Sequence, residues 1–173
     1  TLLDYPEHTA CTVFLAGCNF RCPFCHNSEI LNLATAQSLM DDRELLTFLK
    51  KRQGLLDGVC VSGGEPTLRP ELPELFREIK KLGFKTKLDT NGTNPEMIKY
   101  LAENLLVDYI AMDIKTAPEH YDTLAGTWVD TDAIKESAHY IMFCGIDYEF
   151  RTTVVKGLHQ VQDFEAIGQW LKD

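Results

Sequence analysis

The sequence predicts an α/β protein in which parallel strands form a partial β/α barrel with outer helices. Short apolar runs recur along the chain, and segments with helical periodicity lie between them. Strands that alternate with helices of this length pair in parallel through right-handed crossovers. Because no repeat, low-complexity tract or linker interrupts the pattern, we expect a single domain over residues 1–173.

Five segments rich in Val, Ile, Leu, Phe and Thr are the expected strands: residues 11–15, 58–61, 85–88, 107–112 and 148–155. Helices are expected over residues 41–52, 70–82, from 94 onwards, 130–143 and 162–171. Asp42 and Glu44 lie in the first turn of the first helix, where the helix dipole favours acidic residues. Gly83 is expected to end the second helix, and Asn94 to cap the third before Pro95.

Length and charge narrow the range of functions. The chain has 173 residues and a formal net charge of -9, which argues against a protein that binds the nucleic-acid backbone. A chain of this size buries roughly two-thirds of its unfolded surface, so we expect a substantial core. The sequence shows neither a secretory leader pattern nor an uninterrupted apolar stretch of about 18 residues. We therefore expect a cytoplasmic protein with no nucleic-acid partner and no membrane partner.

Three closely spaced cysteines are the most informative residues. Cys18, Cys22 and Cys25 lie within eight positions, so one short loop can present three thiolates. Structural zinc takes four protein ligands, and a fully ligated four-iron cluster takes four cysteines. No second Cys-x-x-Cys pair follows, which favours three ligands and one exchangeable position. The alternative is that they pack as unrelated small apolar side chains. Core packing is expected for the other cysteines: Cys11, Cys60 and Cys144.

Other candidate residues follow the second, third and fourth predicted strands. Gly63 and Gly64 allow a close approach of the backbone to a ligand, and Glu65 offers a carboxylate to an ammonium group. An ordinary turn between strand and helix is the alternative. Asp89 and Asp113 would repel each other at one end of a barrel unless a cation or an ammonium group lay between them. The alternative is that both aspartates cap helices.

The spacing Cys-x3-Cys-x2-Cys, with Phe24 before the last cysteine, resembles the signature of the radical S-adenosylmethionine (SAM) enzymes. Residues 62–66 resemble the Gly-Gly-Glu-Pro segment of the same family. The resemblance implies a [4Fe-4S] cluster on Cys18, Cys22 and Cys25, with SAM at the open iron and cleavage to a 5'-deoxyadenosyl radical. It also implies a partial barrel of the radical SAM type, with its site at the C-terminal ends of the strands.

Further segments resemble the activating enzymes of glycyl-radical enzymes: residues 25–27, 89–92, 112–115 and 151–157. Residues 3–6 and 14–18 look most like the branch that activates anaerobic ribonucleoside-triphosphate reductase, with pyruvate formate-lyase activating enzyme as a close relative. The matches run from the first residues to about Gly157. Because the resembled family often extends past a sixth strand, we expect a chain truncated at its termini.

The resemblance implies a set of cofactor-binding residues: Phe24, His26, Gly63, Gly64, Glu65, Asp89, Asn91, Lys115 and Arg151. Phe24 and His26 are expected near the adenine, and the Gly-Gly-Glu segment at the methionine amino group. A hydrophobic anchor is the alternative for Phe24, and a loop hydrogen bond is the alternative for His26. No function is assigned to three further histidines: His120, His139 and His159.

The charged residues have two implied roles. Lys115 and Arg151 are expected to neutralise the carboxylate of SAM, with surface salt bridges as the alternative. Asp89, Thr90 and Asp113 are expected to form a monovalent cation site beside the cofactor. The alternative for the two aspartates remains helix capping.

The implied function is a radical SAM activase that generates a glycyl radical on a partner enzyme, which we expect to be anaerobic ribonucleotide reductase. Cluster potentials span roughly -700 to +450 mV, and SAM cleavage needs the negative end, so flavodoxin or ferredoxin is the expected donor. One alternative is a pyruvate formate-lyase-type activase or another radical SAM enzyme acting on a peptide or small molecule. Another is an iron-sulfur electron carrier, for which residues 63–65 and 89–92 would have no purpose.

Overall fold

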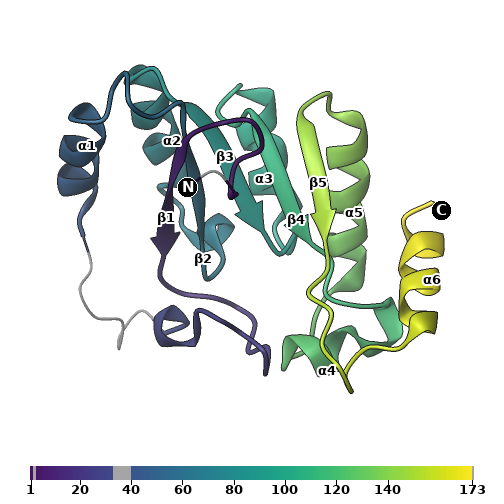
Figure 1. Cartoon of the computed structure of the whole chain (residues 1–173). Helices are drawn as coiled ribbons and strands as arrows, with labels where there is room; N and C mark the ends of the chain where they lie inside the picture. Colours follow the sequence, from purple (N-terminus) through teal and green to yellow (C-terminus); the bar gives the residue numbers. More distant parts are fainter. Residues whose placement is uncertain (2, 33–39, 173) are drawn as a thin grey trace.

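The computed structural model describes residues 1, 3–32 and 40–172 of the chain. Its strands form one five-stranded parallel sheet in chain order: β1 (Ala10–Leu15), β2 (Gly58–Gly63), β3 (Lys85–Thr90), β4 (Tyr109–Asp113) and β5 (Asp147–Arg151). Figure 1 shows these strands side by side, with every arrow pointing toward the same end of the molecule. Parallel strands in sequential order form the predicted partial β/α barrel. The segments that follow the strands therefore meet at one edge of the sheet.

The helices are α1 (Asp42–Lys50), α2 (Leu72–Lys81), α3 (Pro95–Glu103), α4 (Tyr121–Ala125), α5 (Thr131–Phe143) and α6 (Val161–Trp170). In Figure 1, α2, α3 and α5 lie behind the sheet, whereas α4 lies near the loop that follows β1. The predicted cap of α3 is confirmed, because the Asn94 side chain accepts from the Met97 amide at 3.1 Å. Among the described residues, no helix has the length and apolar character needed to cross a membrane.

The two faces of the sheet differ in polarity, because successive side chains of a strand point to opposite faces. On the face covered by helices, Val61, Leu88 and Met112 are fully buried in the hydrophobic core. Burying each such side chain stabilises the fold by about 1.5–3 kcal/mol. Lys87 and Asp89 of β3 point to the other face of the sheet. That face is therefore charged toward its C-terminal edge.

All five predicted strands are confirmed, but β5 ends at Arg151 and not at residue 155. The reason is the register: Arg151 pairs with Asp113, which is the last residue of β4. Beyond this pair, no strand among the described residues continues the ladder of β5. The sequence did not predict α4, because a helix of five residues is too short to show a periodic pattern.

Candidate functional site

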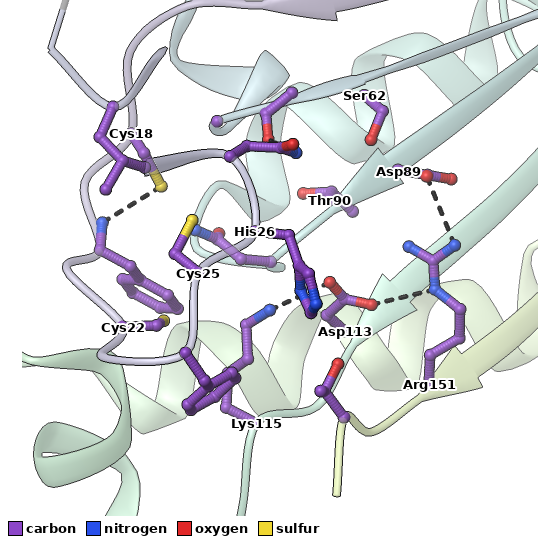
Figure 2. Close-up of a pocket in the computed structure, with 18 residues that line it drawn as sticks. Cys18, Cys22, Cys25, His26, Ser62, Asp89, Thr90, Asp113, Lys115 and Arg151 are labelled. Atoms are coloured by element: carbon purple, nitrogen blue, oxygen red, sulfur yellow. Dashed lines mark hydrogen bonds and ion pairs between the residues drawn. The ribbon is translucent and has the colours of Figure 1, made fainter. Parts of the chain in front are cut away.

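A cavity lies at the C-terminal edge of the sheet, where the strand ends and the loop after β1 meet (Figure 2). It is lined by thirteen of the predicted site residues: Cys18, Cys22, Phe24, Cys25, His26, Gly63, Gly64, Asp89, Thr90, Asn91, Asp113, Lys115 and Arg151. Figure 2 shows the three cysteines on one loop at one side of the cavity, and Asp89, Asp113 and Arg151 at the other. The fold therefore brings together residues that are up to 133 positions apart in the sequence.

The cysteine loop, residues 18–25, is held by backbone hydrogen bonds at both ends. The Cys18 amide donates to the carbonyl of Leu31 at 3.2 Å, and the Cys25 amide donates to the carbonyl of Cys22 at 3.1 Å. In the middle, the Arg21 amide donates to the carbonyl of Ala125 at 2.7 Å, which ties the loop to α4. The helix that the sequence did not predict thus supports the cysteines.

A histidine to which the sequence assigned no function connects the cysteine loop to the charged side of the cavity. The ring of Phe24 meets the ring of His159 edge to face, with 6.3 Å between centroids. The Val155 amide donates to Nδ1 of His159 at 3.1 Å, so the proton lies on Nε2, which donates to the carbonyl of Lys115 at 2.9 Å. His159 therefore holds the backbone of Lys115 and the ring of Phe24 in place together.

The glycine pair is required by close backbone packing as well as by the cavity. Gly63 has a φ of +127°, and a Cβ there would lie 2.3 Å from the carbonyl oxygen of Leu15. A Cβ on Gly64 would lie 2.0 Å from the carbonyl oxygen of Gly17. The Gly64 amide donates to the carbonyl of Leu15 at 2.9 Å, and the Glu65 amide donates to the carbonyl of Gly17 at 2.8 Å. The end of β2 is thereby fixed against the start of the cysteine loop.

The Glu65 side chain, predicted to bind the amino group of the methionine part of SAM, is enclosed by protein donors. Glu65 is only 3% exposed, and its carboxylate accepts from the Thr90 hydroxyl at 2.8 Å, from the Asn91 amide at 2.7 Å and from both donors of Thr67. Burial raises the pKa of Glu65, although these hydrogen bonds oppose the shift. Because its oxygens face protein donors, Glu65 anchors the turn after β3 and does not present its carboxylate to the cavity.

The anchored turn also contacts the cysteine loop. The Asn91 amide group donates to the side-chain oxygen of Asn19 at 2.9 Å, and the Asn19 amide group donates to the Thr93 hydroxyl at the same distance. Glu65, Asn91 and Asn19 therefore form a hydrogen-bonded connection from the end of β2 through the end of β3 to the cysteine loop.

Five alternating charges lie opposite the cysteines, four of them in the lining of the cavity and Lys87 beneath it. Nζ of Lys87 lies 2.8 Å from Oδ1 of Asp89, and Oδ2 of Asp89 lies 3.3 Å from Nη1 of Arg151. Nε of Arg151 lies 3.0 Å from Oδ1 of Asp113, and Oδ2 of Asp113 lies 3.0 Å from Nζ of Lys115. Figure 2 shows Arg151 between the two aspartates. We call this set of residues the charge row.

The monovalent cation predicted at Asp89, Thr90 and Asp113 does not fit this arrangement. Each carboxylate oxygen of the two aspartates already contacts a lysine or arginine nitrogen. The Thr90 hydroxyl donates to Glu65 and accepts from the amide of Gly92 at 3.1 Å. Basic side chains therefore occupy the oxygens that a cation would need, and they supply the charge that keeps the aspartates apart.

The electrostatics of the two sides differ. Burial raises the pKa of the Cys18 and Cys22 thiols, and the ammonium of Lys115 opposes this shift at Cys22. Burial by itself would also raise the pKa of Asp113, but Lys115 and Arg151 outweigh it and hold that pKa below its ordinary value. The Cys18 and Cys22 thiols thus need nearby positive charge to ionise, whereas the aspartates of the charge row already have basic partners.

The sequence reasoning missed several residues that line the cavity: Phe20, Asn27, Leu31, Ser62 and Thr153. Asn27 donates to the carbonyl of Gly63 at 3.3 Å. Asn27 and Ser62 lie in two of the segments that resemble the family, residues 25–27 and 62–66, and this was the signal available for them. Lys87 was also missed, although a lysine in the middle of a predicted strand is unusual.

Comparison with known proteins agrees with these features. Residues 12–171 match the sequence model of the Radical SAM superfamily. A Methanocaldococcus jannaschii protein, provisionally named a glycyl-radical enzyme activating enzyme, is 34% identical over 180 residues, which covers 99% of this chain and 72% of the relative. Pyruvate formate-lyase 1-activating enzyme of Escherichia coli K12 is 31% identical over 169 residues, which covers 92% of this chain and 67% of the relative.

Two solved structures show the same fold. SuiB of Streptococcus suis bound to SAM has a TM-score of 0.72 at 17% identity, over 93% of this chain and 37% of SuiB. A domain of pyruvate-formate lyase-activating enzyme from Bacteroides vulgatus has a TM-score of 0.57 at 20% identity, over 66% of this chain and 71% of that domain. The similarity supports the interpretation of the sheet as a partial barrel of the radical SAM type.

The matched family implies a [4Fe-4S] cluster and SAM, and the cavity suits both. Cys18, Cys22 and Cys25 all line it, and three thiolates can each bind a different iron of one cluster. Within the part of the chain that the structure describes, no three His, Cys, Asp or Glu side chains lie close enough together to hold a single metal ion. Three cysteines are one ligand short of a structural zinc site, which takes four protein ligands, and they suit a cluster with one open iron. Lys115 and Arg151 line the same cavity and bring positive charge to it.

Proposed function

Because this chain belongs to the radical SAM superfamily, we propose that it generates a glycyl radical on a partner enzyme and that this partner is anaerobic ribonucleotide reductase. The observation that carries the proposal is the cavity itself, which is lined by the three-cysteine loop, the glycine pair, Lys115 and Arg151. The relative from Methanocaldococcus jannaschii, which is matched over 99% of this chain, supports the activase function.

Each part of the cavity has a defined task in this proposal. Cys18, Cys22 and Cys25 hold the cluster and leave one iron free for SAM. When bound, the cluster supplies one electron that cleaves SAM, and the 5'-deoxyadenosyl radical then takes a hydrogen atom from a glycine of the partner. Lys115 and Arg151 bind the carboxylate of SAM by charge-assisted hydrogen bonds.

The remaining contacts position the rest of SAM. Gly63 and Gly64 bring backbone polar groups to the amino group of the methionine part, because the Glu65 carboxylate is already used by protein donors. Phe24 offers an aromatic edge to the adenine, and His26 offers a polar neighbour. Asn91 lines the same cavity from the turn after β3.

The choice of partner rests on residues 3–6 and 14–18, which resemble the anaerobic ribonucleotide reductase branch. A pyruvate formate-lyase is the second candidate, because enzymes named for its activation match this chain in Escherichia coli and Streptococcus mutans. A low-potential flavodoxin or ferredoxin is the proposed electron donor, since SAM cleavage needs the negative end of the cluster range. An oxygen-poor cytoplasm suits an exposed cluster of this kind.

Electron paramagnetic resonance tests the proposal. The reconstituted protein, reductant and SAM are mixed anaerobically with an anaerobic ribonucleotide reductase or with a pyruvate formate-lyase, and 5'-deoxyadenosine is quantified in each tube. A glycyl-radical doublet with matching 5'-deoxyadenosine is expected with the reductase. A doublet only with the lyase would replace the partner, and 5'-deoxyadenosine without a doublet in either tube would contradict the activase function.

A further inference from the structure

Lys87 is a buried cation beneath the cavity. Its side chain is 1% exposed, and its ammonium lies 2.8 Å from Oδ1 of Asp89 and 3.5 Å from Oε1 of Glu149. The same ammonium lies over the ring of Tyr109, 5.6 Å from the centroid. Burying an ammonium group is costly unless it is paired and hydrogen-bonded. The fold therefore retains this charge by surrounding it with two carboxylates and an aromatic face.

Lys87 acts on the cavity indirectly. It is not among the residues that line the cavity, whereas Asp89, two positions further along β3 on the same face, is one of them. Asp89 divides its carboxylate between Lys87 and Arg151, with Oδ1 on the lysine and Oδ2 on the arginine. Lys87 can therefore affect a bound cofactor only indirectly, through Asp89 and Arg151.

The charges of this region balance only when Lys87 is counted. Lys87, Arg151 and Lys115 are positive, and three carboxylates face them: Asp89, Asp113 and Glu149. Without Lys87 the group would carry one net negative charge, and Oδ1 of Asp89 would lose its partner at 2.8 Å. A carboxylate that is 13% exposed would then attract either a cation from solution or the guanidinium of Arg151.

We propose that Lys87 is a positioning residue that supplies, from within the fold, the positive charge at Asp89 for which a monovalent cation was predicted. By holding Oδ1 of Asp89, it leaves Oδ2 to orient Arg151 toward the cavity. Cofactor binding in this chain is consequently independent of monovalent cations. The inference rests on the proposed function, because SAM is the ligand that reports on it.

The test compares SAM binding by the reconstituted wild-type protein and by Lys87→Met, in potassium chloride and in tetramethylammonium chloride at equal ionic strength. Methionine keeps most of the volume of the side chain and removes its charge. We expect the wild type to bind SAM equally in both salts. We expect Lys87→Met to bind about tenfold more weakly in tetramethylammonium, in the range for loss of an outer-shell partner, and to recover in potassium.

Lys80→Met is the matched control, because Lys80 forms an ion pair with Asp108 at 2.6 Å beside the opposite end of β4. It should leave SAM binding independent of the salt. A wild-type affinity that rises in potassium overturns the inference, as does a Lys87→Met affinity equal to the wild type in both salts or weakened equally in both. If Lys87→Met does not fold, the wild-type comparison still decides. Failure of the wild type to bind SAM at all would count against the proposed function instead.

Discussion

The two sides of the cavity are encoded over different ranges of the sequence. The cysteine side comes from residues 18–25, so eight consecutive residues define its three ligands. The charge row comes from β3, the end of β4 with the residues that follow it, and β5, and its members meet only because the strands pair in register, with Asp113 beside Arg151. A local motif thus specifies the proposed cluster ligands, whereas the topology of the sheet specifies the charges on the other side of the cavity.

The two sides also differ in whether the protein itself supplies positive charge to their acidic groups. Burial raises the pKa of Cys18 and Cys22, so these thiols become good ligands only when positive charge reaches them. In the charge row each aspartate has its cationic partners within the protein. The comparison predicts that Cys18 and Cys22 become anionic only when iron binds, while the charge row is preorganised in the cluster-free protein.

The largest effect is expected from Cys22→Ala, which breaks the cysteine side. Two thiolates cannot hold three irons, so the variant should lose the cluster and with it SAM cleavage. Iron content and 5'-deoxyadenosine production measure both losses. Cys144→Ala is the control, because this half-buried cysteine directly follows α5 and does not line the cavity. Full 5'-deoxyadenosine production by Cys22→Ala would remove the cluster assignment.

A second large effect is expected from Glu65→Gln, which breaks the connection between the two sides. The glutamine side chain would place an NH2 group where a carboxylate oxygen now accepts hydrogen bonds. The buried donors that face this oxygen would then lose their acceptor. We expect a loss of unfolding free energy on the order of 3 kcal/mol. Anaerobic denaturant unfolding of the cluster-free protein measures it. Glu71→Gln, at an exposed position, is the control and should be neutral; equal stability of both variants would refute the anchoring role.

A moderate effect is expected from Asp113→Asn, which leaves the cysteine side intact and interrupts the charge row. Lys115 and Arg151 would lose their shared anionic partner and their fixed positions, so SAM should bind about tenfold more weakly. Equilibrium binding to the reconstituted protein measures this, with Asp147→Asn at the opposite, exposed end of β5 as the control. If SAM affinity did not change, the charge row would have no part in cofactor binding.

The comparison of the two sides explains how much the sequence could predict. Parallel strands, most helices and the three cysteines follow from local patterns: apolar runs, caps such as Asn94, and ligand spacing. The C-terminal edge as the place of the site follows from the resemblance to the radical SAM family. These predictions depend on residues that are close in sequence or on that resemblance.

The remaining features depend on contacts between distant segments. Glu65 receives donors from Thr90 and Asn91, and Lys87 reaches Glu149, 62 positions away. Both side chains have formal charges that a single sequence cannot distinguish from surface charges. The cation predicted at Asp89 and Asp113 does not fit the structure for this reason: the sequence indicated a need for positive charge, but three basic side chains that meet this need lie beside the aspartates only in the fold.

The smallest effect concerns pH and tests whether the charge row is preorganised without a cofactor. The pKa of Asp113 lies below its ordinary value of 3.8, because Lys115 and Arg151 outweigh the effect of burial. A carboxyl group with a lowered pKa in the folded state stabilises the protein above its unfolded pKa, and this contribution is lost as the pH falls through the folded value. The stabilisation should therefore be present at neutral pH and disappear in acid below 3.8.

The melting temperature of the cluster-free protein, followed from neutral pH into acid for the wild type and Asp113→Asn, isolates this contribution, since all other acids are common to both. The wild type should be the more stable at neutral pH, and the two curves should converge below pH 3.8. The difference will be modest, because Asp113 retains 32% exposure and solvent screens its ion pairs. Parallel curves throughout would mean that the charge row forms only when the cofactor binds, which would make the two sides of the cavity alike in this respect.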